Sequence, residues 1–377
     1  MKIAYISNST IPSRTANSIH VMKICQAFSK LENDVILLAP NVAEVESKVD
    51  DIYSYYDTEK TFNIKQLFWP RIKGRAYVYG LSIAKQVRKT KPDLIYGRFL
   101  AGCYFSSVYS NKPVVFEAHQ PIKDSGRIQE FLFKKLIRRK NFEKLVVISE
   151  ALKHHYLDNF SIDESKIFVA HDGADVAPEN ILPVKLKYRE AKVNVGYVGQ
   201  LYSGKGMEVI SKIAPKCPWA NFHIVGGLEK DIEYWKRELN GIDNIFFYGF
   251  VPHSETVNYL KAFDIVLAPY QKKVSGYGGG KSNLSQWMSP LKIFEYMSLG
   301  KPIIASDLPV LREVLRNNEN SILCDPEDTD EWVEALKWLS KDKKARESIG
   351  LKAKEDFLNE YTWKQRAEKI LSSLKLD

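Results

Sequence analysis

A glycine-rich turn in the second half of the chain contains the residue types of a phosphate site. The β-branched run VNVGYVG leads into GQLYSGKG at 199–206, and the helical pattern MEVISKIA follows. A strand, a glycine turn and a helix in this order direct backbone N–H groups toward a phosphate, and Lys205 adds a positive charge. The turn nearly matches the P-loop pattern, but Gly206 replaces the Ser or Thr that binds magnesium. We predict a nucleotide phosphate site and not an ATPase; the alternative is a glycine turn that only lets strand and helix pack closely.

The stretch SPLKIFEYMSLGKPIIAS at 289–306 has the start and stop signals of a short helix. Ser289 is a suitable N-cap, Pro290 suits the first helical position, and Gly300 suits the position after the helix. These signals predict a helix over about 290–299, followed by a strand.

Lys292 and Glu295 lie three residues apart on this helix, on neighbouring positions of one surface. A diphosphate at the helix N-terminus would lie beside Lys292, and Glu295 would accept hydrogen bonds from paired ribose hydroxyls. The alternative is an ordinary surface ion pair. The apolar neighbours favour the binding interpretation, because a lone carboxylate on an apolar helix needs a polar partner.

The elements that position these residues follow an alternating pattern. Short β-branched runs alternate with longer helical patterns, which is typical of βαβ units and a parallel sheet. Helical spacing of apolar residues also predicts a crossover helix between Pro12 and Leu31. The strand candidates are 2–7, 34–40, 94–97, 113–119, 144–149 and 166–171, and then 193–199, 221–227, 244–250, 265–270, 301–306 and 321–324.

The chain of 377 residues is long enough for two lobes, each with its own core. A charged, proline-bearing stretch without periodicity follows HDGADV and is the best linker candidate. We expect a first lobe over 1–178, a second lobe over 191–355, and a C-terminal helical segment over 356–377.

The composition indicates which class of protein this is and in which cellular compartment it is expected. The hydrophobic fraction is 45% and the charged fraction 27%, as in an ordinary globular protein, and no apolar run approaches the ~18–20 residues that span a bilayer. The N-terminus lacks the apolar core of a signal peptide and is expected to form a strand. The four cysteines lie far apart, which argues against a zinc site and a disulfide framework and favours a reducing cytoplasm.

The formal charge of +9 favours a polyanionic partner, and the most basic segment is FLFKKLIRRKNFEKL at 131–145. A helical pattern there gives one apolar face and one cationic face. The apolar face is expected to pack on its own lobe, while the cationic face would permit contact with anionic lipid headgroups at the inner membrane face. The basic residues are Lys134, Lys135, Arg138, Arg139 and Lys140.

Other polar constellations have structural interpretations. The histidines at 20, 154, 155, 171, 223 and 253 do not have the spacing of metal ligands, so no metal site is predicted. Asp328 and Asp330 precede a helical pattern and are expected to cap it. The loop over 272–287 has four glycines and is longer than usual, which favours a mobile cover over a ligand.

These motifs together resemble the retaining nucleotide-sugar glycosyltransferases of family 4, which have the GT-B fold. The similarity covers most of the chain: SPLKIFEYMSLGKPIIAS resembles the family signature, and FEAH at 116–119 resembles a strand that ends in an active-site histidine. Further similar segments are PSRTANSIHVMKICQAFSKL (12–31), VVISEALKHHYL (146–157), HDGADV (171–176) and YTWKQRAEKIL (361–371). The implied fold is α/β, with two Rossmann-like parallel-sheet lobes and a C-terminal helix that returns to the first lobe.

The resemblance assigns roles to individual residues. Lys205 would hold the donor diphosphate, Glu295 the ribose, and His119 would contact the donor sugar and steady the transition state. The acceptor side would include Arg98 and the loop with Ser13, Asn17 and Ser18. The implied nucleotide-sugar-binding residues are Gly199, Gln200, Lys205, Gly206, Val251, Pro290, Leu291, Lys292 and Glu295.

Two departures from the family pattern change these expectations. Trp287 occupies the position where the family often has the first of two glutamates, so the donor-sugar contact of that residue is missing. Gln200 replaces an arginine that often follows the glycine corresponding to Gly199, so Lys205 and Lys292 are expected to compensate the phosphate charge.

The implied activity is the transfer of a hexosyl or N-acetylhexosaminyl group, with retention of configuration, from a UDP-linked donor. The expected acceptor is a glycan or lipid-linked glycan. The expected process is the assembly of a bacterial surface polysaccharide such as O-antigen, capsule or lipopolysaccharide. Neither a cofactor nor a divalent metal is expected, since the nucleotide sugar is a substrate. The alternatives are a nucleotide-sugar 2-epimerase and a non-catalytic nucleic-acid-binding protein; the chain contains no recognisable nucleic-acid motif, so no nucleic-acid partner is expected.

Overall fold

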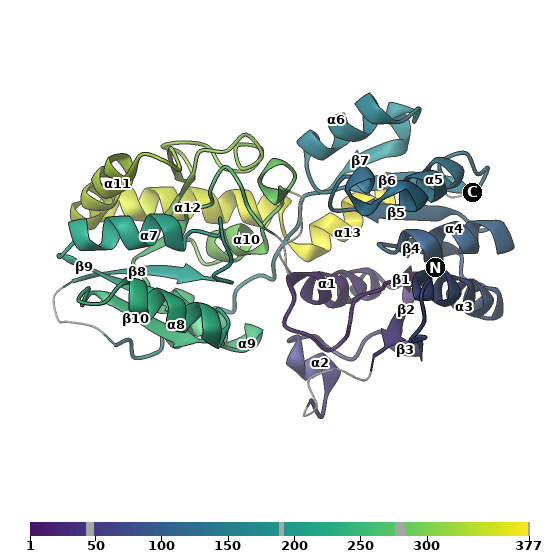
Figure 1. Ribbon diagram of the computed structural model, residues 1–377, viewed down its shortest axis with the longest axis horizontal. Coiled ribbons are helices and arrows are strands. Elements are labelled where there is room, and N and C mark those ends of the chain that lie inside the picture. The colour runs from purple at the N-terminus through teal and green to yellow at the C-terminus, as the bar shows by residue number, and fades with distance from the viewer. Residues whose placement is uncertain (43–48, 188–191, 276–282, 376–377) are drawn as a thin grey trace. The chain divides into compact units, whose positions relative to one another are not determined.

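The computed structural model describes residues 1–42, 49–187, 192–275 and 283–375, and it divides into two compact units (Figure 1). Unit 1 consists of Met1–Asp172 with Trp363–Asp377, and unit 2 consists of Gly173–Thr362. The sequence places these divisions at 178 and 356. They shift because the Ala174 N–H donates to the Tyr361 carbonyl at 3.1 Å, so the two connecting segments pair within unit 2.

Unit 1 contains a parallel seven-stranded sheet in the order β3-β2-β1-β4-β5-β6-β7. All six strands expected in this half of the chain are found, and β3 is an addition. Its alternating, mostly exposed polar residues give an edge strand that lacks an apolar run. The strands are β1 (Lys2–Ile6), β2 (Asp34–Asn41), β3 (Asn63–Phe68), β4 (Leu94–Gly97), β5 (Val114–Ala118), β6 (Phe142–Val147) and β7 (Ile167–Val169).

The helices of unit 1 include the expected crossover helix, α1, which follows a Thr15 N-cap. They are α1 (Ala16–Lys30), α2 (Ile52–Tyr55), α3 (Arg75–Thr90), α4 (Leu100–Tyr109), α5 (Arg127–Leu136), α6 (Glu150–Asn159) and α13 (Trp363–Ser372), with short 3₁₀ helices at Ile122–Ser125 and Glu164–Lys166.

The sequence pattern suggested a helix over the basic segment 131–145, but the structure divides this segment between two elements. Helix α5 ends at Leu136, and β6 begins at Phe142. Only Leu132, Phe133 and Leu136 of this segment's helical part are buried. The apolar set expected for the helix ends at Ile137, the C-cap of α5, whereas Phe142 and the residues after it belong to the buried strand β6.

Unit 2 contains a parallel six-stranded sheet in the order β10-β9-β8-β11-β12-β13, and its strands coincide with the six expected runs. They are β8 (Val193–Val198), β9 (Ala220–Val225), β10 (Ile245–Gly249), β11 (Ile265–Ala268), β12 (Ile303–Ser306) and β13 (Ile322–Cys324). The helices are α7 (Met207–Ile213), α8 (Glu229–Glu238), α9 (His253–Ala262), α10 (Leu291–Ser298), α11 (Thr329–Lys341) and α12 (Lys343–Glu360), with 3₁₀ helices at Ala214–Lys216 and Leu284–Gln286.

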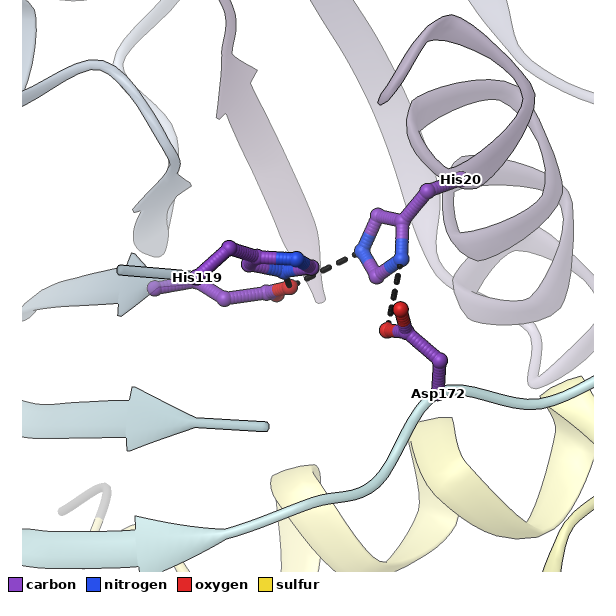
Figure 2. Close-up of side chains that lie close together, drawn as sticks. His20, His119 and Asp172 are labelled. Carbon is purple, nitrogen blue, oxygen red and sulfur yellow. Dashed lines mark hydrogen bonds and ion pairs between the residues drawn. The ribbon is translucent and has the colours of Figure 1, made fainter. Parts of the chain in front are cut away.

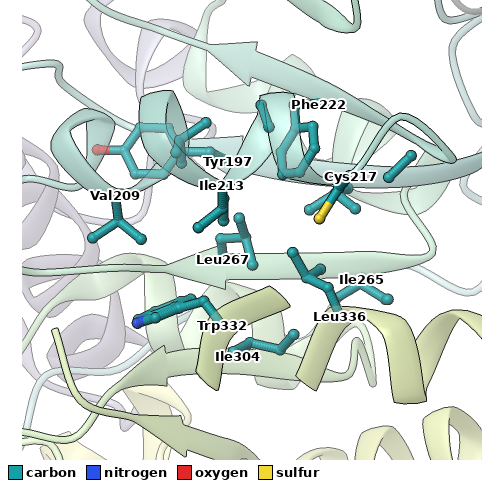
Figure 3. Packing of buried hydrophobic residues seen from close by; sticks show 14 of the residues in the cluster. Tyr197, Val209, Ile213, Cys217, Phe222, Ile265, Leu267, Ile304, Trp332 and Leu336 are labelled. Carbon is teal, nitrogen blue, oxygen red and sulfur yellow. The ribbon is translucent and has the colours of Figure 1, made fainter. Parts of the chain in front are cut away.

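The core of unit 2 joins the sheet to α7 and α11 (Figure 3). Trp332 of α11 is fully buried, and its indole N–H donates to the Asp325 carbonyl at 2.9 Å, which satisfies its single donor. Asp328 accepts from the N–H groups of Asp330 and Glu331 and caps α11, which confirms the expected role of this carboxylate. The core therefore fixes the strands whose ends carry the candidate site.

Both sheets place their first strand in the middle, so the chain leaves it in opposite directions on the two sides. The switch lies between β1 and β4 in unit 1, and between β8 and β11 in unit 2. Ligands of open parallel sheets bind at the carboxyl ends of the strands beside such a switch. Among the described residues, no helix has both the length and the apolar character to span a membrane.

Gly196 in β8 supplies a test of this packing. A Cβ atom at Gly196 would overlap the ring of Phe263, which is itself buried. We expect Gly196→Ala to destabilise unit 2 by about 1–3 kcal/mol through overpacking, measured by urea unfolding. In the double variant with Phe263→Ala, the loss should be smaller than the sum of the two single losses; additive losses would contradict this packing.

Candidate functional site

The glycine turn of unit 2 begins at the carboxyl end of β8. The Gly199 N–H donates to the Val225 carbonyl at 2.9 Å, and its φ of 147° lies in the region that favours glycine. A Cβ at Gly199 would lie 2.7 Å from Nζ of Lys292, so the missing side chain lets this lysine approach the strand end.

Lys205 and Lys292 converge on the ring of Tyr270, and Lys292 also lies over the ring of Tyr197. The Nζ atom of Lys292 lies 3.8 Å from the ring centroid of Tyr197 and 5.3 Å from that of Tyr270, and the Nζ atom of Lys205 lies 5.5 Å from that of Tyr270. The Nζ atom of Lys292 is buried without a hydrogen-bond partner, and neither lysine forms an ion pair with another described residue.

Burial lowers the pKa of Lys205 to about 8. Burial, and then the neighbouring Lys205, hold the pKa of Lys292 well below its usual range, although Glu295 acts in the opposite direction. Buried charges are normally paired because desolvation is costly. These two lysines could therefore hold an anion, and within the protein their ammonium groups face tyrosine rings.

The backbone amides of the glycine turn behave differently from the sequence expectation. The N–H groups of Gly204 and Gly206 donate to the carboxylate of Glu208, at 2.7 and 3.4 Å. A Cβ at Gly206 would lie 2.5 Å from Cγ of Pro269. Close packing, the alternative left open by the sequence, therefore explains these two glycines, and the phosphate hypothesis rests on the lysine side chains.

Helix α10 is held at the switch point by Tyr296. The Tyr296 hydroxyl accepts from the Val198 N–H at 2.9 Å and donates to the Leu267 carbonyl at 3.3 Å, and thus joins the ends of β8 and β11. The expected N-cap was wrong by one residue: Pro290 is the N-cap because its ψ of 122° is extended, and Leu291 is the first helical residue.

The end of α10 confirms the expected position of Gly300. With a φ of 63°, Gly300 donates to the Met297 carbonyl at 2.9 Å, and Lys301 donates to the Tyr296 carbonyl at 3.1 Å. This is a Schellman termination, in which the left-handed position favours glycine.

Glu295 has a partner that the sequence did not identify. Nε2 of His253 lies 2.9 Å from Oε1 of Glu295, and both side chains are partly exposed. His253 begins α9, two residues after Val251 and beyond the carboxyl end of β10. The position of His253 just beyond a strand end could have indicated a site residue. The spacing of histidines along the sequence gave no reason to pair His253 with Glu295.

The two departures from the family pattern, Gln200 and Trp287, both lie in unit 2. Gln200 is half-buried, and its Oε1 atom has no hydrogen-bond partner among the described residues. Trp287 is half-buried and donates its backbone N–H to the Leu284 carbonyl at 3.0 Å. Residues 276–282 of the expected cover lie outside the described residues, while Ser275 at its base donates to the Ser203 carbonyl at 3.2 Å.

In unit 1, His119 follows β5 and belongs to a buried cluster. Its Nε2 atom lies 2.5 Å from Oε1 of Glu117, and Glu117 Oε1 lies 2.8 Å from Nε2 of His20. Nδ1 of His20 lies 3.0 Å from Oδ1 of Asp172, and Nη2 of Arg366 lies 3.0 Å from Glu117 Oε1. Figure 2 shows one ring nitrogen of His20 directed at the carboxylate of Asp172, and its other ring nitrogen faces Glu117.

Ligand atoms of His20, Glu117, His119 and Asp172 all lie within 4.8 Å of one another, a grouping that sequence spacing did not reveal. Two features favour a charge network over a metal centre. His20 uses opposite ring nitrogens for its two carboxylates, and the Arg366 guanidinium occupies the space beside Glu117. A bound cation would have to displace this internal positive charge.

The residues expected on the acceptor side lie after β1 and β4, the strands beside the switch of unit 1. Arg98 follows β4, and its Nη1 atom is buried without a hydrogen-bond partner among the described residues. Asn17 is exposed in the first turn of α1. Ser18 is buried and donates to the Ser13 and Thr15 carbonyls at 2.8 and 2.9 Å, so its hydroxyl serves the start of α1.

Among the remaining histidines, His223 has the structural role expected from the sequence. Its ring nitrogens lie 2.9 Å from the Tyr248 hydroxyl and 3.0 Å from Oδ1 of Asn194, and burial lowers its pKa to about 4. His154 is exposed on α6, as expected of a solvated helix face. His171 Nδ1 contacts the Ile148 carbonyl at 3.0 Å.

Two parallel-sheet lobes with this topology define the GT-B fold, and comparisons with known proteins identify the family. The model described as Glycosyltransferase Family 4 matches residues 18–177, and the model described as Glycosyl transferases group 1 matches residues 179–356. The chain is therefore a glycosyltransferase of the GT-B type.

Relatives support this assignment over nearly the whole chain. An uncharacterized glycosyltransferase of Methanocaldococcus jannaschii is 25% identical, over 97% of this chain and 96% of its own. The structure of HepE from Anabaena in complex with UDP is similar with a TM-score of 0.74 and 14% identity, over 99% of both chains. The lipopolysaccharide outer core galactosyltransferase WaaB is similar with a TM-score of 0.68 and 15% identity, over 99% of both chains.

The unpaired positive charge of Lys205 should lower the free energy of unfolding, and this effect can be measured. We expect Lys205→Met to stabilise the protein by about 1–3 kcal/mol at pH 7, because it removes a poorly solvated cation. Since the wild-type side chain loses its proton above about pH 8 in the folded state, the advantage should shrink between pH 8 and the ordinary lysine value. Exposed Lys212 on α7 is the control: Lys212→Met should change stability by less than about 0.5 kcal/mol.

Proposed function

We propose that the protein transfers a hexosyl or N-acetylhexosaminyl group, with retention of configuration, from a UDP-linked donor to a glycan or lipid-linked glycan. The observation that carries the proposal is the buried Nζ atom of Lys292, which has no hydrogen-bond partner among the described residues, beside half-buried Lys205 at the switch of unit 2. A diphosphate would supply the missing negative charge. The crystallised HepE complex with UDP and the family models favour a transferase over the 2-epimerase.

Each candidate residue has a specific role in this proposal. Lys205 and Lys292 bind the diphosphate and stabilise the charge that develops on it as the glycosidic bond breaks, without requiring a divalent metal. Glu295 accepts from the ribose hydroxyls, and His253 orients its carboxylate. His119 of unit 1 contacts the transferred sugar, and Arg98 belongs to the acceptor side.

Donor binding tests the nucleotide half of the proposal. In a screen of nucleoside diphosphate sugars, we expect UDP and a UDP-sugar to raise the melting temperature and the UDP-sugar to be hydrolysed slowly. Lys205→Ala and Lys292→Ala should each weaken UDP binding by about 10- to 100-fold, measured by calorimetry. Affinity should also fall as pH rises above about 8, because Lys205 must then take up a proton when the anion binds.

The ribose contact requires a control that leaves the phosphates unchanged. Glu295→Gln should weaken UDP binding but have little effect on a UDP analogue without ribose hydroxyls, whereas Lys205→Ala should weaken both. If Lys205→Ala and Glu295→Ala both leave donor affinity and transfer intact, the site assignment is wrong.

The charge of the chain is distributed unequally between the units. Unit 1 carries 30 Lys and Arg against 20 Asp and Glu, whereas unit 2 carries 25 against 26. We infer that this excess brings unit 1 to an anionic membrane surface, where a lipid-linked acceptor would be found. The lipopolysaccharide galactosyltransferase among its structural relatives supports an acceptor of this kind.

The proposed membrane surface consists of Ile128 and Phe131 of α5, the basic residues 134–140, and Val108 and Tyr109 of α4. The exposed fractions of Ile128 and Phe131 are 60% and 56%. The two parts are neighbours because Arg139 donates to the Ser107 carbonyl at 3.0 Å, next to exposed Val108 and Tyr109. Exposed apolar side chains beside cations are typical of proteins that bind at a lipid interface.

Vesicle flotation tests this surface. Lys135, Arg138 and Lys140 are exposed, and their side chains form no hydrogen bond or ion pair with another described residue, so we expect their combined replacement by Glu to keep the fold and to abolish binding to anionic vesicles. Replacement of exposed Lys337, Lys341 and Lys344 of unit 2 by Glu changes the charge equally and should leave binding intact. Equal losses in both variants would indicate a net-charge effect and contradict a defined surface.

A further inference from the structure

The carboxylate of Glu117 is the centre of the buried cluster in unit 1. Glu117 is 1% exposed and lies on β5. It contacts Tyr96 through the phenol hydroxyl, His119 Nε2 at 2.5 Å, His20 Nε2 at 2.8 Å and Arg366 Nη2 at 3.0 Å. Tyr96 and Arg366 donate hydrogen bonds to this carboxylate, which can only accept when ionised, whereas His20 contacts it at ion-pair distance without hydrogen-bond geometry.

Arg366 brings the C-terminal helix α13 into this cluster. It is 2% exposed, and its Nε atom donates to the His171 carbonyl at 2.9 Å while Nη2 contacts Glu117. Trp363 of the same helix packs edge-on against the ring of His20, with centroids 5.2 Å apart. Helix α13 therefore contacts Glu117 through its guanidinium and His20 through its indole.

The ionisation states follow from these contacts. Burial by itself would raise the pKa of Glu117, but Arg366, His20 and His119 hold it well below its usual range. Burial, followed by the positive charge of Arg98, lowers the pKa of His119 to about 4, although Asp172 and Glu117 act in the opposite direction. At neutral pH, a neutral imidazole thus faces an ionised carboxylate.

A neutral imidazole has one N–H, and an ionised carboxylate can only accept. The hydrogen must therefore be on Nε2 of His119, which faces Glu117, and Nδ1 is left as an acceptor. His119 in this form can accept a hydrogen bond from a hydroxyl, but it cannot donate one through Nδ1.

We propose that Glu117 and Arg366 are positioning residues: Arg366 of α13 holds the Glu117 carboxylate, and Glu117 fixes His119 as the Nε2–H tautomer so that Nδ1 accepts from a hydroxyl of the sugar substrate. The sugar contact rests on the proposed function, whereas the tautomer is a property of unit 1 alone. Docking of the C-terminal helix thereby becomes a requirement for a correctly oriented His119.

The tautomer can be observed directly in the full-length protein. With ¹⁵N-labelled histidine and long-range proton–nitrogen spectra, assigned by the signal lost in His119→Asn, we expect His119 to have unprotonated Nδ1 and protonated Nε2 from pH 8 down to about pH 5. An Nδ1–H tautomer, or protonation of the ring near the ordinary histidine value, would overturn the proposal.

Substitutions can distinguish an effect on the orientation of His119 from a general loss of the fold. In Glu117→Gln an amide N–H can face Nε2, so we expect a shift toward the Nδ1–H tautomer and a fall in kcat of at least about 100-fold with unchanged UDP affinity. Arg366→Lys keeps the charge but loses the planar fork, and should lower kcat by about tenfold or more, again without changing UDP affinity. Tyr96→Phe is a comparison variant: it removes another bond to the same carboxylate but keeps the ionised Glu117 facing His119, so the tautomer should stay Nε2–H.

Each outcome has a defined meaning. A Glu117→Gln protein with the wild-type tautomer and kcat overturns the proposal. If Glu117→Gln fails to fold because Arg366 is left unpaired, the wild-type spectra and Arg366→Lys decide the question. Absence of transfer from every UDP-sugar in the wild type would instead refute the proposed function, since the tautomer measured by NMR does not depend on it.

Discussion

A buried charge needs a partner of opposite charge, and this constraint shapes the candidate sites of both units. The two units satisfy it in different ways. In unit 1, the Glu117 carboxylate is compensated internally by Arg366 and by two imidazoles. In unit 2, Lys205 and Lys292 are buried against tyrosine faces and form no ion pair with another described residue. The first arrangement stabilises a fixed geometry, whereas the second leaves positive charge for an anionic substrate.

The same constraint explains why the glycines and the lysines of the turn have different roles. Gly204 and Gly206 permit close contact between the turn and neighbouring backbone, and their N–H groups are bonded to Glu208. Gly199 lets Lys292 reach the end of β8. The turn thus supports the cations, and the cations supply the electrostatic attraction for phosphate.

Charge also distinguishes the units at their surfaces. The excess of basic residues belongs to unit 1, while unit 2 is nearly neutral despite its candidate diphosphate site. A few buried lysines are sufficient to bind a small anion, because the low dielectric strengthens each interaction. An extended anionic surface instead attracts many exposed, solvated charges, which is the pattern of unit 1.

The sequence by itself determined the alternation of strands and helices, the two lobes, and the candidates Lys205, Lys292 and Glu295, because periodicity and turn chemistry are local properties. His119 became a candidate only through the resemblance to a known family. The sequence pattern assigned a helix to residues 131–145, but α5 ends at Leu136 and β6 begins at Phe142, two residues before the expected strand start at 144. Only the tertiary structure decided the partners: Arg366 meets Glu117 across 249 residues, and His253 meets Glu295 across 42. Such contacts depend on strand order and on the return of α13, and residue spacing along the chain contains no record of either.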